Sequence, residues 1–381
     1  MTSLKKMVLF GAGKIGRSFI GQLFSRGGYE VVFVDISASI VNQLNKTRKY
    51  MVVIKSEAGD DVLEIENVRG ILLQNEQEVI KELATASIAS VSVGQQGLPS
   101  VLPLISGALQ IRFKNQGLWP LDIIIAENMR NAREYIAGEL SKLLPAEFPL
   151  TQMVGLVETS IGKMVPIMAG AVSASDPLVV YAEPYNTLIL DKKGFKNPIP
   201  QVEGLAPREN MKAWVDRKLF IHNLGHATAA YIGFRKYPQA VYLYEVLAHT
   251  EVYTQTRNTM LQSAEILMAL YPGEFTQEQL TSHIDDLLIR FQNRALGDTI
   301  FRVGCDLFRK LGPNDRLVAP IHAAQRLGMP YTLIKEAILA SLSFKAKDEN
   351  GNFFTSDEVF FRLAERGAAI VINEVCGLKN I

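Results

Sequence analysis

The stretch Met7-Val-Leu-Phe-Gly-Ala-Gly-Lys-Ile-Gly16 decides how the N-terminal half of this chain folds. A short apolar run enters a glycine turn of the pattern G-x-G-x-x-G, and the helix-like segment Arg17–Arg26 follows directly. Strand, glycine turn and helix in this order are typical of a dinucleotide-binding unit, in which a pyrophosphate meets the N–H groups at the start of the helix. We therefore expect a doubly wound, Rossmann-type α/β domain to begin here.

An acidic residue stands where such a domain needs one. The apolar run Glu30–Val34 ends at Asp35, about 20 residues beyond the glycines, where a carboxylate binds the ribose hydroxyls and repels the 2′-phosphate of NADP. NAD is therefore the predicted cofactor. Gly11 should allow the tight turn, Gly13 should admit the pyrophosphate and Gly16 should let helix and strand pack closely. The residues expected to border the cofactor are Gly11, Ala12, Gly13, Lys14, Ile15, Gly16 and Asp35, with Val93 and Gly94 after a later strand.

Composition narrows the class of protein. The 381 residues are enough for two domains, and 40 Lys and Arg against 39 Asp and Glu give no sign of a nucleic-acid partner. Cys305 and Cys376 are far apart in sequence, which suits a reducing cytoplasm and gives no disulfide framework. No apolar run is as long as the roughly 18 residues of a membrane span, and the apolar start enters the glycine turn directly, so no secretory signal is expected.

The remaining patterns divide the chain into two domains. Alternating apolar runs predict strands at Ile88–Val93, Asp122–Ala126 and Met153–Val157, and a hairpin formed by Leu178–Ala182 and Thr187–Leu190. A Pro- and Gly-rich passage follows, and from Arg208 onward the pattern is that of helices joined by polar turns. We predict a cofactor domain over residues 1–206 and a mainly α-helical substrate domain over 207–381.

The helical half carries the residues that can do chemistry. In Lys218-Leu-Phe-Ile-His-Asn-Leu-Gly-His226, Asn223 lies about 140° and His226 about 80° around an α-helix from Lys218, so all three can face one cleft. Oxidation of an alcohol without a metal needs a base for the hydroxyl proton and donors that hold the oxygen. His222 lies between Lys218 and His226 on the same wheel, so periodicity alone does not choose between the two histidines.

These residues resemble the polyol-specific long-chain dehydrogenase/reductase family, often called the mannitol dehydrogenases. The resemblance runs from Phe10 to about Pro320, through Phe10–Arg17, Val91–Gly94, Glu127–Met129, Asp176–Pro177, Arg217–His226, Arg302–Gly304 and Asp315–Leu317. It implies metal-independent chemistry with Lys218 as general base, Asn128 and Asn223 binding the alcohol or alkoxide oxygen, and His226 orienting the substrate. His222 is then a residue that supports the site from behind or packs in the core.

The resemblance also implies a substrate pair, a hexitol phosphate and a ketose phosphate such as mannitol 1-phosphate and fructose 6-phosphate. The cluster Arg302, Arg309, Lys310 and Arg316 can receive a phosphate or can be a solvated helix face, and we name Arg302, Arg309 and Lys310 as candidate substrate residues. The chain departs from the phosphate-specific branch at Gly162-Lys163, where an Asp-Arg pair is usual, and at Cys305, where an arginine is usual.

Three alternatives remain open. The substrate can be an unphosphorylated polyol or a uronate, and the chain can be a non-catalytic sensor of NAD that keeps the fold.

His222 and His226 have the i,i+4 spacing of a zinc site, but Asn223 stands where a hydrolytic zinc motif needs Glu, and no third ligand is near in sequence. We therefore predict that the chain holds no metal.

Overall fold

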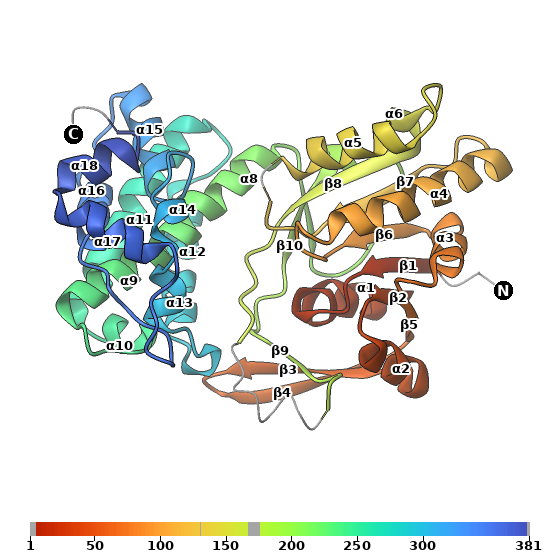
Figure 1. Cartoon of the computed structure of the whole chain (residues 1–381), viewed down its shortest axis with the longest axis horizontal. Helices are drawn as coiled ribbons and strands as arrows, with labels where there is room; N and C mark the ends of the chain where they lie inside the picture. The colour runs from red at the N-terminus through yellow and green to blue at the C-terminus, as the bar shows by residue number, and fades with distance from the viewer. Residues whose placement is uncertain (1–4, 130, 167–175, 379–381) are drawn as a thin grey trace. The chain divides into compact units, whose positions relative to one another are not determined.

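The computed structural model describes residues 5–129, 131–166 and 176–378. The chain divides into two compact units, Met1–Met211 and Lys212–Ile381 (Figure 1). Each unit has its own core, and each is described by itself below. Along the described ranges, no helix combines the length and the apolar character that crossing a membrane requires.

The first unit is built on a doubly wound sheet. Within the described part of the chain the sheet has eight strands in the order β11-β10-β8-β7-β6-β1-β2-β5. The parallel strands are β1 (Lys5–Phe10), β2 (Tyr29–Asp35), β5 (Val68–Leu72), β6 (Ile88–Val91), β7 (Leu121–Ile125) and β8 (Val154–Ser160). Taken in chain order they are arranged 3-2-1-4-5-6, with the switch point between β1 and β6, which confirms the predicted fold.

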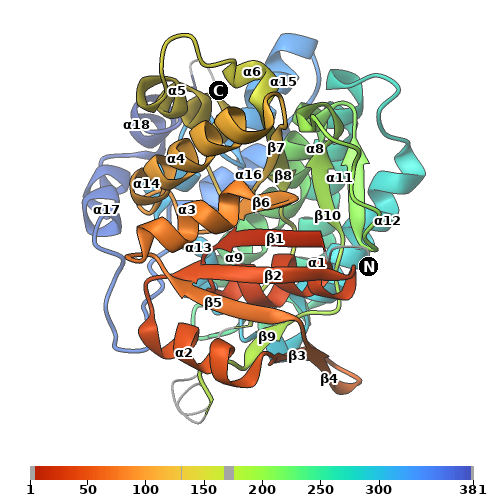
Figure 2. The ribbon, with the colours of Figure 1, turned by 90° about the vertical axis from the view of Figure 1, so that its right-hand side faces the viewer.

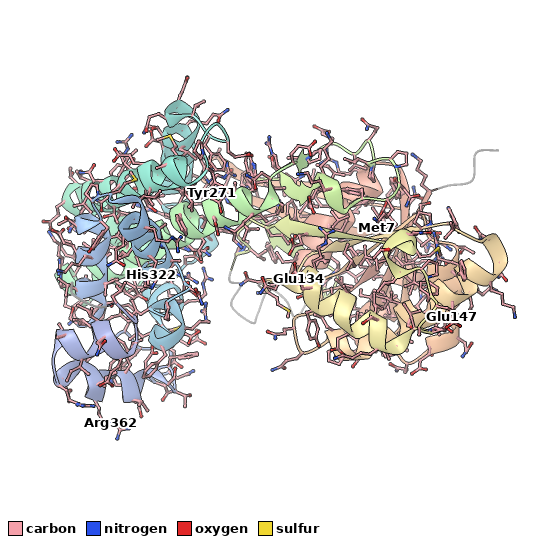
Figure 3. All side chains as sticks on the ribbon, turned by 90° about the horizontal axis from the view of Figure 1, so that it is seen from above. Met7, Glu134, Glu147, Tyr271, His322 and Arg362 are labelled. Atoms are coloured by element: carbon pink, nitrogen blue, oxygen red, sulfur yellow. The ribbon has the colours of Figure 1, made fainter. Side chains whose placement is uncertain are left out.

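Helices cover both faces of this sheet because side chains alternate along its strands. Val8 and Phe10 of β1 are fully buried in a core with α3 (Glu76–Ala84), α4 (Leu98–Gln116) and α5 (Ala132–Leu143). Met7 and Leu9 point the other way, into a core with the π-helical turn η1 (Gly16–Gly21) and α1 (Gln22–Arg26). Figure 2 shows α3 and α4 in front of the sheet, and Figure 3 labels Met7 among the packed side chains of this unit.

The predicted hairpin near residue 185 is wrong. The two segments are strands, β9 (Val180–Ala182) and β10 (Leu188–Asp191), but they belong to different sheets. β9 runs parallel to β3 (Tyr50–Ser56) in a small sheet with β4 (Gly59–Ile65), whereas β10 pairs antiparallel with β8 and parallel with β11 (Leu205–Arg208). Between the two strands in sequence lies the buried Glu183, whose carboxylate accepts the N–H of Met164. Three further helical segments complete the unit: α2 (Ala38–Thr47), α6 (Leu150–Met153) and η2 (Lys192–Gly194).

The second unit is mainly helical, which confirms the prediction for the C-terminal half. Its elements are α8 (Met211–Arg217), η3 (Lys218–Asn223), α9 (Leu224–Lys236), α10 (Leu243–Leu247), α11 (Thr250–Leu270), α12 (Gln277–Phe291), η4 (Arg294–Leu296), α13 (Ile300–Gly304), α14 (Leu307–Lys310), α15 (Val318–Leu327), α16 (Thr332–Ser341), α17 (Asp357–Glu365) and α18 (Ala368–Glu374).

Helix α9 packs closely against its neighbours because glycines face them. A Cβ on Gly225 would lie 2.5 Å from the sulfur of Met260 on α11, and one on Gly233 would lie 2.6 Å from Val246 on α10. Tyr231 of the same helix is fully buried and donates to the carbonyl of Gly304 at 3.0 Å. These contacts fix the helix that continues the Lys218 segment.

Candidate active site

The carboxyl ends of β1, β2 and β6 meet at one edge of the large sheet. Phe10 is in register with Val34 and with Val91, so the residues after each strand lie side by side. The Gly11 N–H donates to the Val34 carbonyl at 2.8 Å, and the Ser92 N–H donates to the Phe10 carbonyl at 2.8 Å. In an open α/β sheet, ligands bind at this edge, beside the switch point.

Each of the three motif glycines meets a different environment. Gly11 has a φ of +94°, and a Cβ there would lie 2.1 Å from the Ser92 carbonyl oxygen. A Cβ on Gly16 would lie 2.0 Å from the Gly11 carbonyl oxygen. Apart from Gly13 and its two chain neighbours, no described heavy atom lies within 4 Å of the Cβ position of Gly13. Gly11 and Gly16 are therefore required by packing, whereas Gly13 faces open space.

Asp35 is fixed beside this turn by two backbone donors. Its Oδ2 accepts the Ala12 N–H at 2.7 Å and its Oδ1 accepts the Ser37 N–H at 2.8 Å. Both oxygens keep further acceptor capacity, because an ionised carboxylate offers about four lone-pair positions. Lys14 and Ile15 begin the helix that continues into η1, and N–H groups in a first helical turn have no partner within the helix. Together these groups form a site suited to a pyrophosphate and a ribose.

Arg17 supports the glycine turn from inside, and the sequence arguments gave it no role. Its Nε donates to the Ala12 carbonyl at 2.6 Å and its guanidinium also donates to the Pro177 carbonyl at 2.7 Å. The Tyr50 hydroxyl donates to the Arg17 carbonyl at 2.7 Å. Burial lowers the pKa of Arg17, opposed by Tyr50, Asp35 and Asp176. Its position directly after the last glycine of the motif is the signal that could have found it.

Glu127 fastens the loop after β6 to the end of β7. Its Oε1 accepts the N–H groups of Val93 at 2.7 Å and of Gly94 at 3.1 Å. Burial raises the pKa of this carboxyl, opposed by those two hydrogen bonds. The next residue, Asn128, is exposed, and among the described residues none forms a hydrogen bond with its amide. Asn128 therefore lies at the ligand edge of the sheet with its amide available.

The departure at Lys163 is an internal contact of the first unit. Lys163 is 6% exposed, and its Nζ donates to the Tyr185 carbonyl at 2.7 Å and to the Asn186 side chain at 3.0 Å. The Nζ also lies 5.2 Å from the centre of the Phe19 ring. Gly162 lies beside the same tyrosine, since a Cβ there would be 3.7 Å from the Tyr185 ring. Both residues thus help to hold the segment between β9 and β10.

The Lys218 segment is not a regular α-helix, which corrects the angles used in the sequence argument. Residues Lys218–Asn223 form a π-turn between α8 and α9, and the Leu224 N–H donates to the carbonyl of Leu219, five residues back. In a π-turn, residues five apart are one turn apart, so Asn223 follows Lys218 by about one turn rather than lying about 140° away. The wider turn brings these two side chains closer in direction than α-helical periodicity predicts.

The Lys218 ammonium is destabilised by its surroundings. Burial and then the positive charge of Arg316 lower the pKa of Lys218 to about 8. Arg316 follows α14 in a turn, where its Nε donates to Asp315 at 2.8 Å and its side chain is 13% exposed. A group whose pKa lies near neutral can both take up and return a proton, so Lys218 has the chemistry that a general base needs. Arg316 was noted in the sequence only as a member of a basic cluster.

His226 is held by an acid that the sequence arguments did not name. Its Nε2 lies 3.1 Å from Oδ2 of Asp298, and its ring is stacked on Phe291 with centroids 4.4 Å apart. Burial lowers the pKa of His226, opposed by Asp298. His222 is 6% exposed and packs with its ring 5.5 Å from that of Phe291, and burial also lowers its pKa. Asn223 is half-buried between the two histidines in sequence.

The structure separates the three predicted substrate cations. Arg302 forms an ion pair with Asp298, and Arg309 is exposed and pairs with Asp306 and Asp315. Lys310 turns inward instead, because its Nζ donates to the carbonyls of Val303 at 2.7 Å and of Arg302 at 3.4 Å. Burial and then Arg316 lower the pKa of Lys310 to about 7.

Cys305 lies in the same region of the second unit. Its thiol contacts the Arg302 carbonyl at 3.7 Å, and burial raises its pKa. Within the ranges that the structure describes, no three His, Cys, Asp or Glu residues gather in a way that could hold a metal ion.

Two family models together match nearly the whole chain. The mannitol dehydrogenase Rossmann domain matches residues 5–204, and the mannitol dehydrogenase C-terminal domain matches residues 210–374. The chain belongs to the mannitol dehydrogenase family. The resemblance inferred from the glycine turn and the Lys218–His226 segment is thereby confirmed, and with it the class of enzyme, an oxidoreductase.

Curated relatives and solved structures agree with this family. The chain is 32% identical to the mannitol-1-phosphate 5-dehydrogenases of Halalkalibacterium halodurans and Streptococcus mutans, over 99% of this chain and 97% and 96% of theirs. Mannitol 2-dehydrogenase of Pseudomonas fluorescens, solved with NAD and D-mannitol, has a TM-score of 0.74 at 19% identity, covering 98% of this chain and 88% of that one. A D-sorbitol dehydrogenase has a TM-score of 0.78 at 16% identity, covering 96% and 89%. The two structures share the fold of this chain.

Proposed function

We propose that this protein is a metal-independent, NAD-dependent polyol dehydrogenase that interconverts mannitol 1-phosphate and fructose 6-phosphate. The observation that carries the proposal is the half-buried Lys218, whose pKa is lowered to about 8, in a π-turn that also holds Asn223 and leads directly into α9 with His226. The 32% identity to curated mannitol-1-phosphate 5-dehydrogenases over nearly the whole chain supports this substrate pair. The unpaired Cys305 and Cys376 fit a cytoplasmic enzyme.

The first unit has the groups that NAD requires. Gly13 leaves room for a pyrophosphate beside the first helical turn, and Asp35 keeps acceptor capacity for ribose hydroxyls. Glu127 keeps Val93 and Gly94 in place at the same edge. When bound, NAD accepts or supplies the hydride. The residues of this chain then bind the alcohol, hold its oxygen and move its proton.

The proton is the task we assign to Lys218. The neutral amine takes the proton of the reacting hydroxyl during oxidation, and the ammonium returns it during reduction. The amides of Asn128 and Asn223 donate to the oxygen as it gains negative charge, which lowers the barrier. Arg316 favours the neutral amine by its charge. We assign the phosphate to the exposed Arg309, with Arg302 near it in sequence, while Lys310 remains inside.

A substrate panel followed by NADH absorbance tests this function. It should contain mannitol 1-phosphate, mannitol, other polyol phosphates, fructose 6-phosphate and uronates. We expect kcat/KM for mannitol 1-phosphate to exceed that for mannitol about tenfold to a hundredfold, because a charge-assisted hydrogen bond contributes about 1.5–3 kcal/mol. Arg309→Ala should raise KM for the phosphorylated substrate and leave KM for mannitol unchanged.

The same panel separates the alternatives. Equal efficiency with mannitol and mannitol 1-phosphate would rule out the phosphate site but leave the dehydrogenase. Faster turnover of a uronate would reassign the substrate within the family. A protein that binds NAD and turns over none of these compounds would be a sensor rather than an enzyme.

Asp35 should make the enzyme prefer NAD(H) over NADP(H). The carboxylate is fixed by Ala12 and Ser37, so it cannot move away from a 2′-phosphate without losing two hydrogen bonds. We expect a tenfold to hundredfold difference in dissociation constant, about 1.4–2.7 kcal/mol. Asp35→Ser should narrow the difference by weakening NAD binding and removing the repulsion. Equal affinities in the wild-type protein would mean that Asp35 is not at the ribose.

A further inference from the structure

The environment of His226 determines which of its ring nitrogens carries the proton. Its Nε2 lies 3.1 Å from Oδ2 of Asp298, a side chain that is 5% exposed. An ionised carboxylate has no proton to donate, so the hydrogen bond exists only if Nε2 carries one. The parallel ring of Phe291, 4.4 Å away, covers one face of the imidazole and limits its rotation.

The charges around this pair keep Asp298 ionised. Burial raises the pKa of Asp298, but the hydrogen bond from His226 and the charge of Arg302 outweigh it, so the pKa is lowered. The charged and titratable groups that act on His226 are Asp298, Arg302 and Arg316, and the ring of His222, in the preceding π-turn, lies 5.9 Å from its own. Burial and the two arginines disfavour a second proton on the imidazole, so at neutral pH one nitrogen of His226 is an acceptor.

We propose that Asp298 is a positioning residue that holds His226 with its proton on Nε2, so that Nδ1 accepts a hydrogen bond from a hydroxyl group of the substrate. The inference deepens the proposed function and rests on it. His226 is then matched to a neighbouring hydroxyl of a polyol or sugar. The reacting oxygen, which gains negative charge, needs donors, and these are the Lys218 ammonium and the two asparagine amides.

With this tautomer, His226 presents a hydrogen-bond acceptor to the substrate rather than a donor. A histidine that presented an N–H would stabilise the alkoxide, and its loss would lower kcat for any alcohol. A histidine that presents a lone pair selects substrates with a hydroxyl at one position beside the reacting carbon. Its loss therefore raises KM for such substrates and has little effect on one that lacks that hydroxyl.

Nitrogen NMR on the full chain tests the tautomer without a substrate. The protein has five histidines, so selective ¹⁵N-histidine labelling gives few signals, and His226→Gln identifies the pair that belongs to His226. We expect the His226 Nδ1 shift to be that of an unprotonated nitrogen and the Nε2 shift to be that of an N–H. A wild-type protein with the proton on Nδ1 would overturn the inference whether or not the enzyme oxidises polyols.

Two variants separate the role of Asp298 from a general effect of burial. Asp298→Asn removes the charge with little change of size and should convert the single His226 tautomer into a mixture. Asp357→Asn is the matched control, because Asp357 is 2% exposed in the same unit but accepts the N–H groups of Asp306 and Leu307 rather than a histidine. The control should leave the His226 shifts unchanged, and equal changes in both variants would contradict the assignment.

Kinetics then locate the hydroxyl that His226 binds. Asp298→Asn should lower kcat/KM for mannitol 1-phosphate about tenfold to a hundredfold, mainly through KM, and leave the dissociation constant of NAD unchanged. In a series of monodeoxy analogues of mannitol 1-phosphate, the wild-type enzyme should show a lower kcat/KM for the analogue that lacks the hydroxyl bound by His226. For that analogue alone, Asp298→Asn should not lower kcat/KM any further. Independent losses for every analogue would overturn the inference. No turnover by the wild-type enzyme would instead reject the proposed function.

Discussion

Lys218→Ala is expected to lower the rate of polyol oxidation about a hundredfold or more while leaving the dissociation constant of NAD near its wild-type value. The amine is the assigned base, and with its pKa lowered to about 8 roughly a tenth of it is neutral at pH 7, against less than about one part in a thousand for an ordinary lysine. The groups assigned to NAD, including Gly13 and Asp35, belong to the other unit of the chain. Single-turnover rates and NAD titration would measure the two quantities separately.

Lys212→Ala is the control for Lys218→Ala. Lys212 lies on α8, six residues before Lys218, and its side chain is 75% exposed and bonded to Tyr271 and Asp216. Lys212→Ala should therefore retain wild-type turnover. If Lys218→Ala also retained near-normal turnover, Lys218 would be structural and another group would carry the proton.

The rates of oxidation and reduction should depend on pH in opposite directions. Oxidation needs the neutral amine, so its rate should rise as pH increases through about 8. Reduction needs the ammonium, so its rate should fall over the same range. Both limbs should disappear in Lys218→Ala. A profile without a step near this pH in the wild-type enzyme would contradict the role assigned to Lys218.

Local spacing predicted the parts of the site that lie close together in sequence. The glycine turn and Asp35 are joined by one βαβ connection, and the register of β1 with β2 brings them together as expected. The hairpin prediction was wrong because a short run of apolar residues indicates a strand but not the strand it pairs with. β9 pairs with β3, whose residues lie more than a hundred positions earlier in the chain.

Longer-range partners and helix irregularities were not predictable in this way. Asp298 meets His226 across 72 residues, and no local pattern marks that pairing. The π-turn at Lys218 changes the direction of Asn223, and an α-helical wheel has no place for it. Arg309 and Lys310 are neighbours in sequence, but successive helical residues point about 100° apart, so one is exposed and the other is buried.

Gly13→Ala and Gly11→Ala are expected to have different effects: the first should weaken NAD binding, and the second should lower the stability of the folded protein. Gly13→Ala should raise the dissociation constant of NAD about tenfold to a hundredfold without changing the melting temperature. Apart from residue 13 and its chain neighbours, no described heavy atom lies within 4 Å of the added methyl group, so the folded protein accommodates it. The methyl group nevertheless occupies the space that we assign to the pyrophosphate. Isothermal titration and thermal unfolding would measure the two effects.

Gly11→Ala should instead destabilise the first unit by about 2–5 kcal/mol, because it combines backbone strain with a collision. The φ of +94° disfavours any side chain, and the Cβ would lie 2.1 Å from a carbonyl oxygen of Ser92, which is backbone and cannot turn away. Gly28→Ala separates the two causes, since Gly28 has a φ of +83° but open space around its Cβ position. That control should cost only the strain, about 1–2 kcal/mol.

If Gly13→Ala bound NAD as tightly as the wild type, the pyrophosphate would not approach this turn, and the assignment of the motif to the cofactor would be wrong.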